Sequence, residues 1–277
     1  MTGDTADMRE ISDAIAPTWE RRRSFVETVT TPVREWLIRE LAPQPGDTVL
    51  ELAAGVGETG FEAAALVGKD GRLISSDFSS VMLDAARRRG AELGVENVEY
   101  CQMDAEQIEL EDDSVDRVIC RFGYMLMPNP GAALAETRRV LRPGGKLALA
   151  VWSIPERNPF FTTIGRVMVD AGHVPPPDPQ APGPFALGNE ERLRGLLDDA
   201  GFDEVRTEEI PVRFVFPDVD EYLQLTADTG GPLGLVLRGL PPDERDEIAR
   251  HVEPALAPFA AEGRYEVPGV ALVAAAS

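Results

Sequence analysis

The stretch Asp47-Thr-Val-Leu-Glu51-Leu-Ala-Ala-Gly55-Val-Gly57-Glu-Thr-Gly60 decides the fold of this chain. Its first residues are apolar and strand-like, an acid closes the strand, and a Gly-x-Gly-x-x-Gly loop opens a helix near Phe61. Glycine has no Cβ, so the loop can turn sharply and let a ligand approach its backbone. The first turn of the following helix offers unpaired N–H groups. Strand, loop and helix together predict a nucleotide-type cofactor site.

The rest of the chain continues the alternation of strands and helices. We expect strands at 47–52, 71–76, 98–102, 115–120 and 146–152, with helices at 60–67, 79–93 and 130–140. Such alternation is typical of a parallel sheet covered by helices on both faces. With two later strands, at 205–216 and 265–274, it predicts an α/β fold. The expected architecture is a Rossmann-like, doubly wound, mostly parallel seven-stranded sheet with helical cap insertions.

The parts outside this alternation are mainly helical. Residues 8–41 have apolar positions at helical spacing and predict two or three helices, with Pro17 and Pro32 near helix starts. Further helices are expected at 158–171, 190–200 and over most of 218–260. We therefore expect an N-terminal helical cap over 1–44 and a cofactor-binding domain over 45–277. The domain would carry cap insertions at about 153–188 and 217–262.

Composition limits the partners. The 277 residues include 48 acidic and 27 basic side chains, which gives a formal net charge of −21. Phosphate backbones and anionic membranes repel such a surface, so we expect no nucleic acid and no membrane partner. No run approaches the ~20 apolar residues of a membrane span, and the polar N-terminus is unlike a signal peptide. Cys101 and Cys120 are interpreted as small core residues in a reduced compartment, which predicts a cytoplasmic location.

Acids stand at the ends of three successive strands: Glu51, Asp77 and Asp104. In an open parallel sheet, ligands bind beyond the carboxyl ends of the strands. Asp77 follows Gly57 by 20 residues, close to the spacing at which an acid holds ribose hydroxyls. Asp104 could accept from the amine of a purine, with Phe78 and Met82 beside the base. The simpler alternatives are that Asp77 caps a helix and that Asp104 starts a loop.

Glu51 separates the possible cofactors. A dinucleotide would place phosphates over the glycine loop, where a fixed carboxylate would repel them. S-adenosylmethionine has no phosphate, and its ammonium and sulfonium groups favour nearby carboxylates. The acid before the glycines therefore favours S-adenosylmethionine over NAD.

These motifs resemble the class I S-adenosylmethionine-dependent methyltransferases, in particular the ubiquinone/menaquinone C-methyltransferases. The resemblance rests on 49–60, on Ile74-Ser-Ser-Asp77-Phe-Ser-Ser-Val-Met82, on Asp104-Ala105 and on Leu141-Arg-Pro-Gly-Gly-Lys-Leu147. It covers about 45–152 well. Ala53 departs from the glycine that is common in the family. The resemblance implies S-adenosyl-L-methionine as cofactor, held by Glu51, Ala53, Gly55, Gly57, Asp77, Phe78, Met82, Asp104, Ala105, Cys120 and Arg121. Trp19 is a further candidate, for contact with the cofactor or with the acceptor.

The expected chemistry is in-line displacement of a methyl group from sulfur, for which a catalytic base is optional. No metal site is expected, because the two histidines, His173 and His251, are far apart in the sequence. Tyr124 and His173 are the catalytic candidates. Packing for Tyr124 and a capping role for His173 are the alternatives. The Arg21-Arg22-Arg23 run is interpreted as an exposed helical face, with attraction of an anionic substrate as the alternative.

The sequence thus predicts methyl transfer from S-adenosylmethionine to an O, C or N atom of a hydrophobic small molecule. One alternative is a protein that binds S-adenosylmethionine without transferring its methyl group. A remote one is an NAD-dependent oxidoreductase, for which a Tyr-x-x-x-Lys pair would be expected. The chain has only two lysines, Lys69 and Lys146, and neither has that setting.

Overall fold

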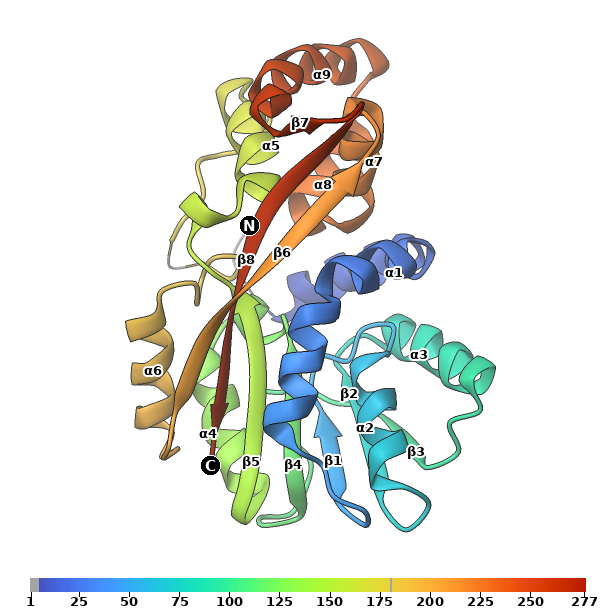
Figure 1. Ribbon diagram of the computed structural model, residues 1–277, viewed down its shortest axis with the longest axis vertical. Helices are drawn as coiled ribbons and strands as arrows, with labels where there is room; N and C mark the ends of the chain where they lie inside the picture. The colour runs from blue at the N-terminus through green and yellow to red at the C-terminus, as the bar shows by residue number, and fades with distance from the viewer. Residues whose placement is uncertain (1–4, 180) are drawn as a thin grey trace.

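A computed structural model describes residues 5–179 and 181–277 (Figure 1). Its centre is one sheet with the strand order β3-β2-β1-β4-β5-β8-β6, and a short β7 pairs with β8. The strands are β1 Thr48–Glu51, β2 Arg72–Asp77, β3 Val98–Gln102, β4 Val115–Arg121, β5 Leu141–Trp152, β6 Arg206–Phe216, β7 Ala260–Ala261 and β8 Arg264–Ala276.

Strands β1 to β5 pair in parallel, and β8 runs antiparallel to both β5 and β6. The mostly parallel α/β sheet that the sequence predicts is therefore confirmed. The count differs by one, because the two-residue β7 adds an eighth strand. The Arg-Pro-Gly-Gly run at 142–145 lies within β5, where the pairing with β4 jumps from Leu141 to Lys146.

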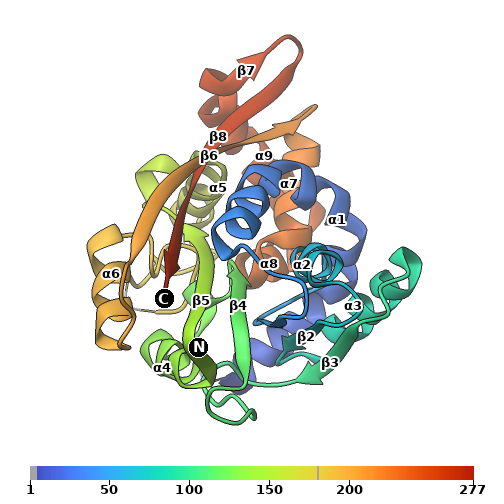
Figure 2. The same ribbon diagram turned by 60° about the horizontal axis from the view of Figure 1, so that its bottom comes forward.

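Five helices flank the sheet: α1 Thr5–Leu41, α2 Thr59–Val67, α3 Ser80–Leu93, α4 Pro130–Val140 and α6 Glu190–Asp199. Both views place α4 and α6 on one side of the sheet, with α1, α2 and α3 on the other (Figures 1 and 2). Short polar side chains fix where helices begin. Ser79 accepts from the Met82 amide at 3.1 Å, and Asn129 accepts from the Ala132 amide at 3.1 Å.

The N-terminal segment is one helix, α1 (Thr5–Leu41), with Pro17 and Pro32 inside it. The prediction of two or three helices starting near these prolines is therefore wrong. Both prolines are exposed, so each ring faces solvent where the helix loses one backbone hydrogen bond. The neighbouring turns remain buried at Ile15, Ala16 and Val33, and this packing keeps the helix continuous. Figure 1 shows that α1 is bent along its length.

The remaining helices form the cap: α5 Pro159–Asp170, α7 Val219–Thr229, α8 Gly231–Gly239 and α9 Pro242–Leu256. The short helical turns η1 Tyr124–Leu126, η2 Pro155–Arg157 and η3 Ala257–Phe259 complete the structure. The long strands β6 and β8 leave the sheet as a ribbon and reach the cap (Figure 1). Within the described residues, no helix has the length and apolar character of a membrane span.

The ribbon binds the cap through alternating side chains of β6. Val212, Phe214 and Phe216 are buried, whereas Val215 between them is 40% exposed. The Phe214 ring stacks on Phe160 of α5 with the ring centroids 3.9 Å apart. Because successive strand residues point to opposite faces, β6 offers one apolar face to the cap and one polar face to solvent.

Replacing Phe214 should therefore cost far more than replacing its neighbour. We expect Phe214→Ala to lower the free energy of unfolding by about 3–5 kcal/mol, as buried Phe-to-Ala changes do. Val215→Ala should change it by less than about 0.5 kcal/mol, because the side chain is largely exposed. Urea unfolding measures both. Equal losses for the two variants would show that the ribbon does not bind the cap in this register.

Candidate functional site

The glycine loop between β1 and α2 is held in left-handed backbone conformations. The φ angles are 50° at Ala53, 58° at Gly55, 85° at Gly57 and 105° at Glu58. L-residues rarely adopt such angles, and a left-handed conformation costs an ordinary residue roughly 1–2 kcal/mol. This explains the family preference for glycine at the position of Ala53. A Cβ on Gly57 would lie 2.3 Å from the Phe61 ring, so that glycine is needed for packing on α2.

Glu51 is 4% exposed and joins the end of β1 to the start of α2. Its Oε1 accepts from the Gly60 amide at 2.8 Å, and its Oε2 accepts from the Ser75 hydroxyl at 3.3 Å. Burial raises the pKa of Glu51 to about 7, although the Gly60 amide, Arg121 and Ser75 oppose the shift. The structure thus gives Glu51 a structural task, and the desolvated carboxylate favours a cation nearby.

Asp77 ends β2 and is also buried. Its carboxylate accepts from the Gly55 amide at 2.8 Å and from the Ser79 amide at 2.9 Å. Burial raises its pKa to about 6, and the nearby Asp13 carboxylate adds to the rise. Asp13, on α1, accepts from the Ser79 hydroxyl at 2.5 Å. Sequence reasoning missed Asp13, because nothing in its own neighbourhood marks it as part of this site.

The third strand end has a looser geometry. The Asp104 carboxylate accepts from the Glu106 amide at 2.9 Å, as a loop-start residue does. Ala105 follows it and is buried. Phe78 is half-buried directly after Asp77, and Met82 is 6% exposed one helical turn further. These residues lie at the same edge of the sheet as Glu51 and Asp77, because β1, β2 and β3 are parallel neighbours.

Helix α1 covers this edge. Ile15, Ala16 and Trp19 of α1 form a small apolar cluster with Val56 of the glycine loop, Met82 and Ala85 of α3, and Leu235 of α8. Trp19 therefore lies against the glycine loop. Its indole Nε1 is buried and has no hydrogen-bond partner in the described part of the chain. A buried indole N–H normally finds an acceptor, so this atom is suited to a bound ligand.

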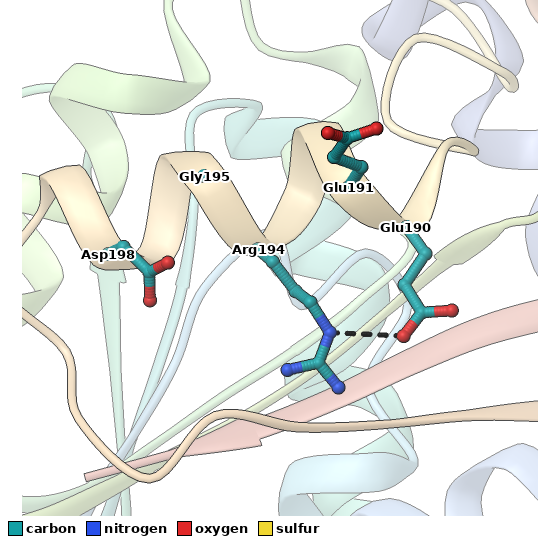
Figure 3. Close-up of a pocket in the computed structure, with 5 residues that line it drawn as sticks. All are labelled: Glu190, Glu191, Arg194, Gly195 and Asp198. Atoms are coloured by element: carbon teal, nitrogen blue, oxygen red, sulfur yellow. Dashed lines mark hydrogen bonds and ion pairs between the residues drawn. The ribbon is translucent and has the colours of Figure 1, made fainter.

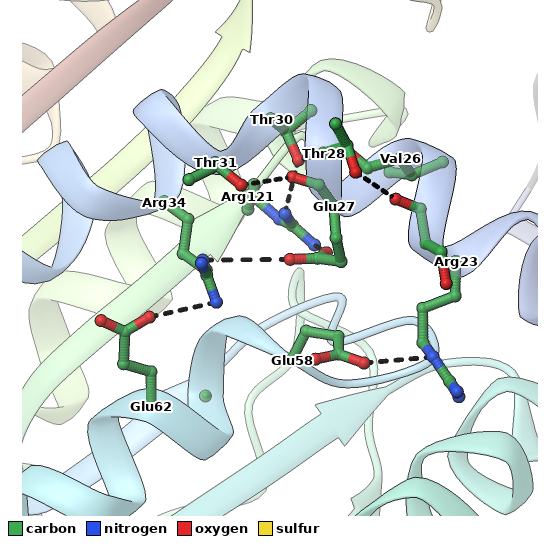
Figure 4. Close-up of polar contacts among 12 residues, drawn as sticks. Arg23, Val26, Glu27, Thr28, Thr30, Thr31, Arg34, Glu58, Glu62 and Arg121 are labelled. Carbon is green, nitrogen blue, oxygen red and sulfur yellow. Dashed lines mark hydrogen bonds and ion pairs between the residues drawn. The ribbon is translucent and has the colours of Figure 1, made fainter.

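Ion pairs bind α1 to the loop and the strand ends (Figure 4). Glu58 lies 3.2 Å from Arg23 of α1 and 2.7 Å from Arg89 of α3. Arg121, at the end of β4, donates to Glu27 at 2.5 Å and to Thr30 at 2.7 Å. The Arg121 side chain therefore faces α1, which leaves only its backbone for the cofactor, as the resemblance implies.

The interpretation of the arginine run as an exposed face is wrong for two of its members. The Arg22 side chain is 23% exposed and donates to Asp228 and Glu221 of α7, both at 2.7 Å. Arg23 is 22% exposed and pairs with Glu58. The reason is that cap and loop both approach α1 at this point and bring carboxylates with them.

The end of β4 lies against the glycine loop. A Cβ on Gly123 would be 2.6 Å from both the Ala53 Cβ and the Cys120 Sγ, so only glycine fits there. Cys120 is fully buried, and burial raises the pKa of its thiol to about 12. Sequence reasoning placed Cys120 at the site but missed Gly123, whose role depends on a contact with a loop 70 residues away.

The two catalytic candidates have different settings. Tyr124 is fully buried, and its hydroxyl lies 2.6 Å from the Thr137 Oγ1, with its pKa raised well above the ordinary value by burial. This geometry favours the packing alternative. His173 lies after α5, and its Nδ1 is 3.7 Å from Glu244 of α9. It is part of the cap, and nothing in the structure brings it to Tyr124.

An aromatic wall stands where β4 and β5 end. Phe122 follows β4 with a φ of 62°, and its ring stacks on Trp152 with the centroids 4.3 Å apart. The ring centroids of Trp152 and Phe161 of α5 lie 5.0 Å apart, and those of Phe161 and Phe185 lie 6.1 Å apart. Phe122, Phe161 and Phe185 are only half-buried. We call these four residues the aromatic wall.

A hollow of about 530 Å³ lies elsewhere, along α6 (Figure 3). It is lined by Glu190, Glu191, Arg194, Gly195 and Asp198, all on that one helix. The Arg194 Nε bonds to the Glu190 carboxylate at 3.0 Å. No residue of the candidate site lines this hollow, and its arginine already pairs with Glu190. The chemistry therefore belongs to the glycine loop and not to this surface.

The raised pKa of Glu51 predicts how stability changes with pH. The folded state binds a proton more tightly than the unfolded state, so stability should fall as pH rises from about 4.5 to 7. A shift of this size corresponds to about 3 kcal/mol. Glu51→Gln keeps an oxygen for the Gly60 amide but cannot ionise. We expect urea unfolding between pH 5 and 8 to show the variant gaining stability over the natural protein as pH rises. If the free energies of unfolding of the two proteins change with pH in parallel, the raised pKa of Glu51 is contradicted.

Comparison with known proteins agrees with this geometry. The profile of the ubiE/COQ5 methyltransferase family matches residues 28–172, more than half of the chain. The ubiquinone/menaquinone biosynthesis C-methyltransferase UbiE of Klebsiella pneumoniae is 31% identical over 170 residues, covering 58% of this chain and 68% of that protein.

Two solved structures share the fold. A methyltransferase of Bacillus halodurans has a TM-score of 0.60 at 22% identity, covering 88% of this chain and 97% of that one. Phosphoethanolamine N-methyltransferase 2 of Haemonchus contortus, solved with S-adenosylhomocysteine, has a TM-score of 0.60 at 16% identity. The match covers 97% of this chain and 60% of that one. The glycine loop, the strand-end acids and these likenesses together establish that the chain belongs to the ubiE/COQ5 family of S-adenosylmethionine-dependent methyltransferases.

Proposed function

We propose that this methyltransferase acts on an O, C or N atom of a hydrophobic small molecule with aromatic character. The observation that supports this most is the aromatic wall at the carboxyl ends of β4 and β5. It adjoins the glycine loop, because Gly123, one residue after Phe122, lies against Ala53. Stacked and edge-on rings at this distance favour a flat apolar ligand.

The residues at the glycine loop suit S-adenosylmethionine. Two desolvated carboxyls, Glu51 and Asp77, favour a cation, and Trp19 offers an unpartnered N–H. We propose that Asp77 holds the ribose and that Glu51, Ala53, Gly55 and Gly57 surround the methionine part. The adenine would lie among Phe78, Met82, Asp104 and Ala105, with the backbone of Cys120 and Arg121 at the methionine end. When bound, the cofactor would supply a methyl group that is activated for transfer by its positively charged sulfur.

The chain contributes mainly position and exclusion of water. Helix α1 lies over the loop, and its ion pairs to Glu58 and Arg121 fix it there. The aromatic wall would hold the acceptor in line with the methyl group, which is the largest contribution that such a reaction needs. Where the acceptor atom carries a proton, we propose His173 as the group that removes it. Tyr124 would act by packing beneath the site.

We propose that different parts of the chain bind the acceptor and the cofactor. Residues 1–44 and the insertions at about 153–188 and 217–262 would cover the acceptor, and the sheet within 45–277 would hold the cofactor. A net charge of −21 disfavours a nucleic acid as acceptor. Together with two free cysteines, the composition favours a reduced, cytoplasmic location.

Asp77→Asn tests the cofactor site. The variant keeps the size of the side chain but loses the charge that strengthens hydrogen bonds to ribose hydroxyls. We expect S-adenosylmethionine binding to weaken by about 1.5–3 kcal/mol in calorimetry, the range for hydrogen bonds to charged groups. Asp84→Asn is the matched control, because Asp84 lies on α3 with its side chain 61% exposed. Equal affinities for the two variants would remove Asp77 from the site.

Label transfer tests the acceptor class. The protein is incubated with methyl-labelled S-adenosylmethionine and either a panel of phenols, quinols and arylamines or a mixture of RNA and DNA. We expect label in organic-soluble products of the panel and none in nucleic acid. Phe122→Ala should lower transfer to the panel by roughly three- to tenfold, the value of one aromatic pair, with unchanged cofactor affinity. Label found only in nucleic acid would overturn the proposal.

A further inference from the structure

Arg238 on α8 carries a guanidinium edge without a partner. Its Nε and Nη2 atoms are buried, and neither has a hydrogen-bond partner in the part of the chain that the structure describes. Other half-buried arginines around the site pair with carboxylates, namely Arg22, Arg23, Arg89 and Arg121. A buried donor without an acceptor is costly, and more so when it is charged. In a chain with 48 acidic residues, this exception indicates an acceptor that comes from outside the chain.

The position of Arg238 relates it to the methyl-transfer site. It follows Leu235 by three residues and Gly234 by four, so all three lie on one face of α8. Leu235 packs in the cluster with Trp19 of α1 and Val56 of the glycine loop. A Cβ on Gly234 would lie 2.6 Å from the Thr226 carbonyl oxygen of α7. This face of α8 is therefore turned towards α1, α7 and the cofactor loop.

One further hydroxyl on the contacting helices lacks a partner in the described structure, that of Thr226 on α7. Helix α7 is held against α1, since the Thr18 hydroxyl donates to the Asp228 carbonyl at 2.6 Å. Together with the guanidinium edge of Arg238 on α8, this hydroxyl favours a ligand with acceptor oxygens.

We propose that Arg238 binds a carboxylate of the methyl acceptor, which makes the substrate a hydrophobic carboxylic acid. This inference rests on the proposed function. The Nε–H and one Nη2–H point the same way along one edge of the guanidinium, and such an edge binds both oxygens of a carboxylate. A single negative charge suits the site better than a phosphate dianion, because Glu51 and Asp77 lie near the loop. Arg238 thereby determines which acceptors are bound and how they are oriented.

The test compares acids with their uncharged amides. Calorimetry on the full chain saturated with S-adenosylhomocysteine would use 2-naphthoate, indole-3-acetate and decanoate, each beside its carboxamide. We expect at least one acid to bind tenfold or more tightly than its amide. Arg238→Gln should abolish that preference, and Arg238→Lys should restore only part of it, because an ammonium lacks the two-pronged edge. Arg166→Gln, an exposed arginine of α5, is the matched control and should keep the preference.

Several outcomes would overturn the proposal. They are the absence of any preference for an acid in the natural protein, a preference that survives in Arg238→Gln, or a loss of S-adenosylmethionine affinity in that variant, which would assign the arginine to the cofactor. Urea unfolding separates a structural role. Removing an unpaired guanidinium should leave the unfolding midpoint unchanged or raise it, and a clear drop would contradict the inference. If acids and amides bind equally well, the hydrophobic acceptor stands and only the role of Arg238 fails.

Discussion

The hydrogen bond from the Gly60 amide to the Glu51 carboxylate is the constraint on which the site depends. It joins the last residue of β1 to the first turn of α2 and so fixes both ends of the glycine loop. The carboxylate lies at the positive end of the helix, which offsets part of the cost of its burial. A Cβ on Gly60 would lie 2.2 Å from the Glu51 Oε2. The acid before the loop therefore explains the last glycine of the motif, and the two residues act as one unit.

A second constraint comes from α1, which covers the glycine loop. Glu58 holds a φ of 105°, an unfavourable angle for a residue with a side chain, and ion pairs with Arg23 and Arg89 hold its carboxylate from two helices. Such strain persists only where the surrounding structure determines the conformation. The cover over the cofactor loop and the shape of the loop are thus fixed by the same contacts. A change in α1 would reach the site through Glu58 and Asp13.

The sequence was sufficient to predict features that depend on neighbouring residues. It was not sufficient to predict features that depend on contacts between segments far apart in the chain. The strands, the glycine loop and the strand-end acids follow from runs of neighbouring residues. Pro17 and Pro32 were misleading, because the packing that keeps α1 continuous involves partners far along the chain. Asp13 and Gly123 were missed for the same reason. Their roles depend on Ser79 and Ala53, which no spacing in the sequence connects with them.

The two buried acids give the site a preference for charge as well as shape. Burial raises the pKa of Glu51 to about 7 and that of Asp77 to about 6, so both carboxyls are poorly solvated as anions. A cationic ligand supplies the stabilisation that water no longer provides, and it favours their ionised forms. A ligand of the same shape without the positive sulfur lacks this contribution. If Glu51 and Asp77 hold the cofactor as proposed, the burial that makes these carboxylates costly to the fold would let the site distinguish a sulfonium from the neutral thioether that remains after methyl transfer.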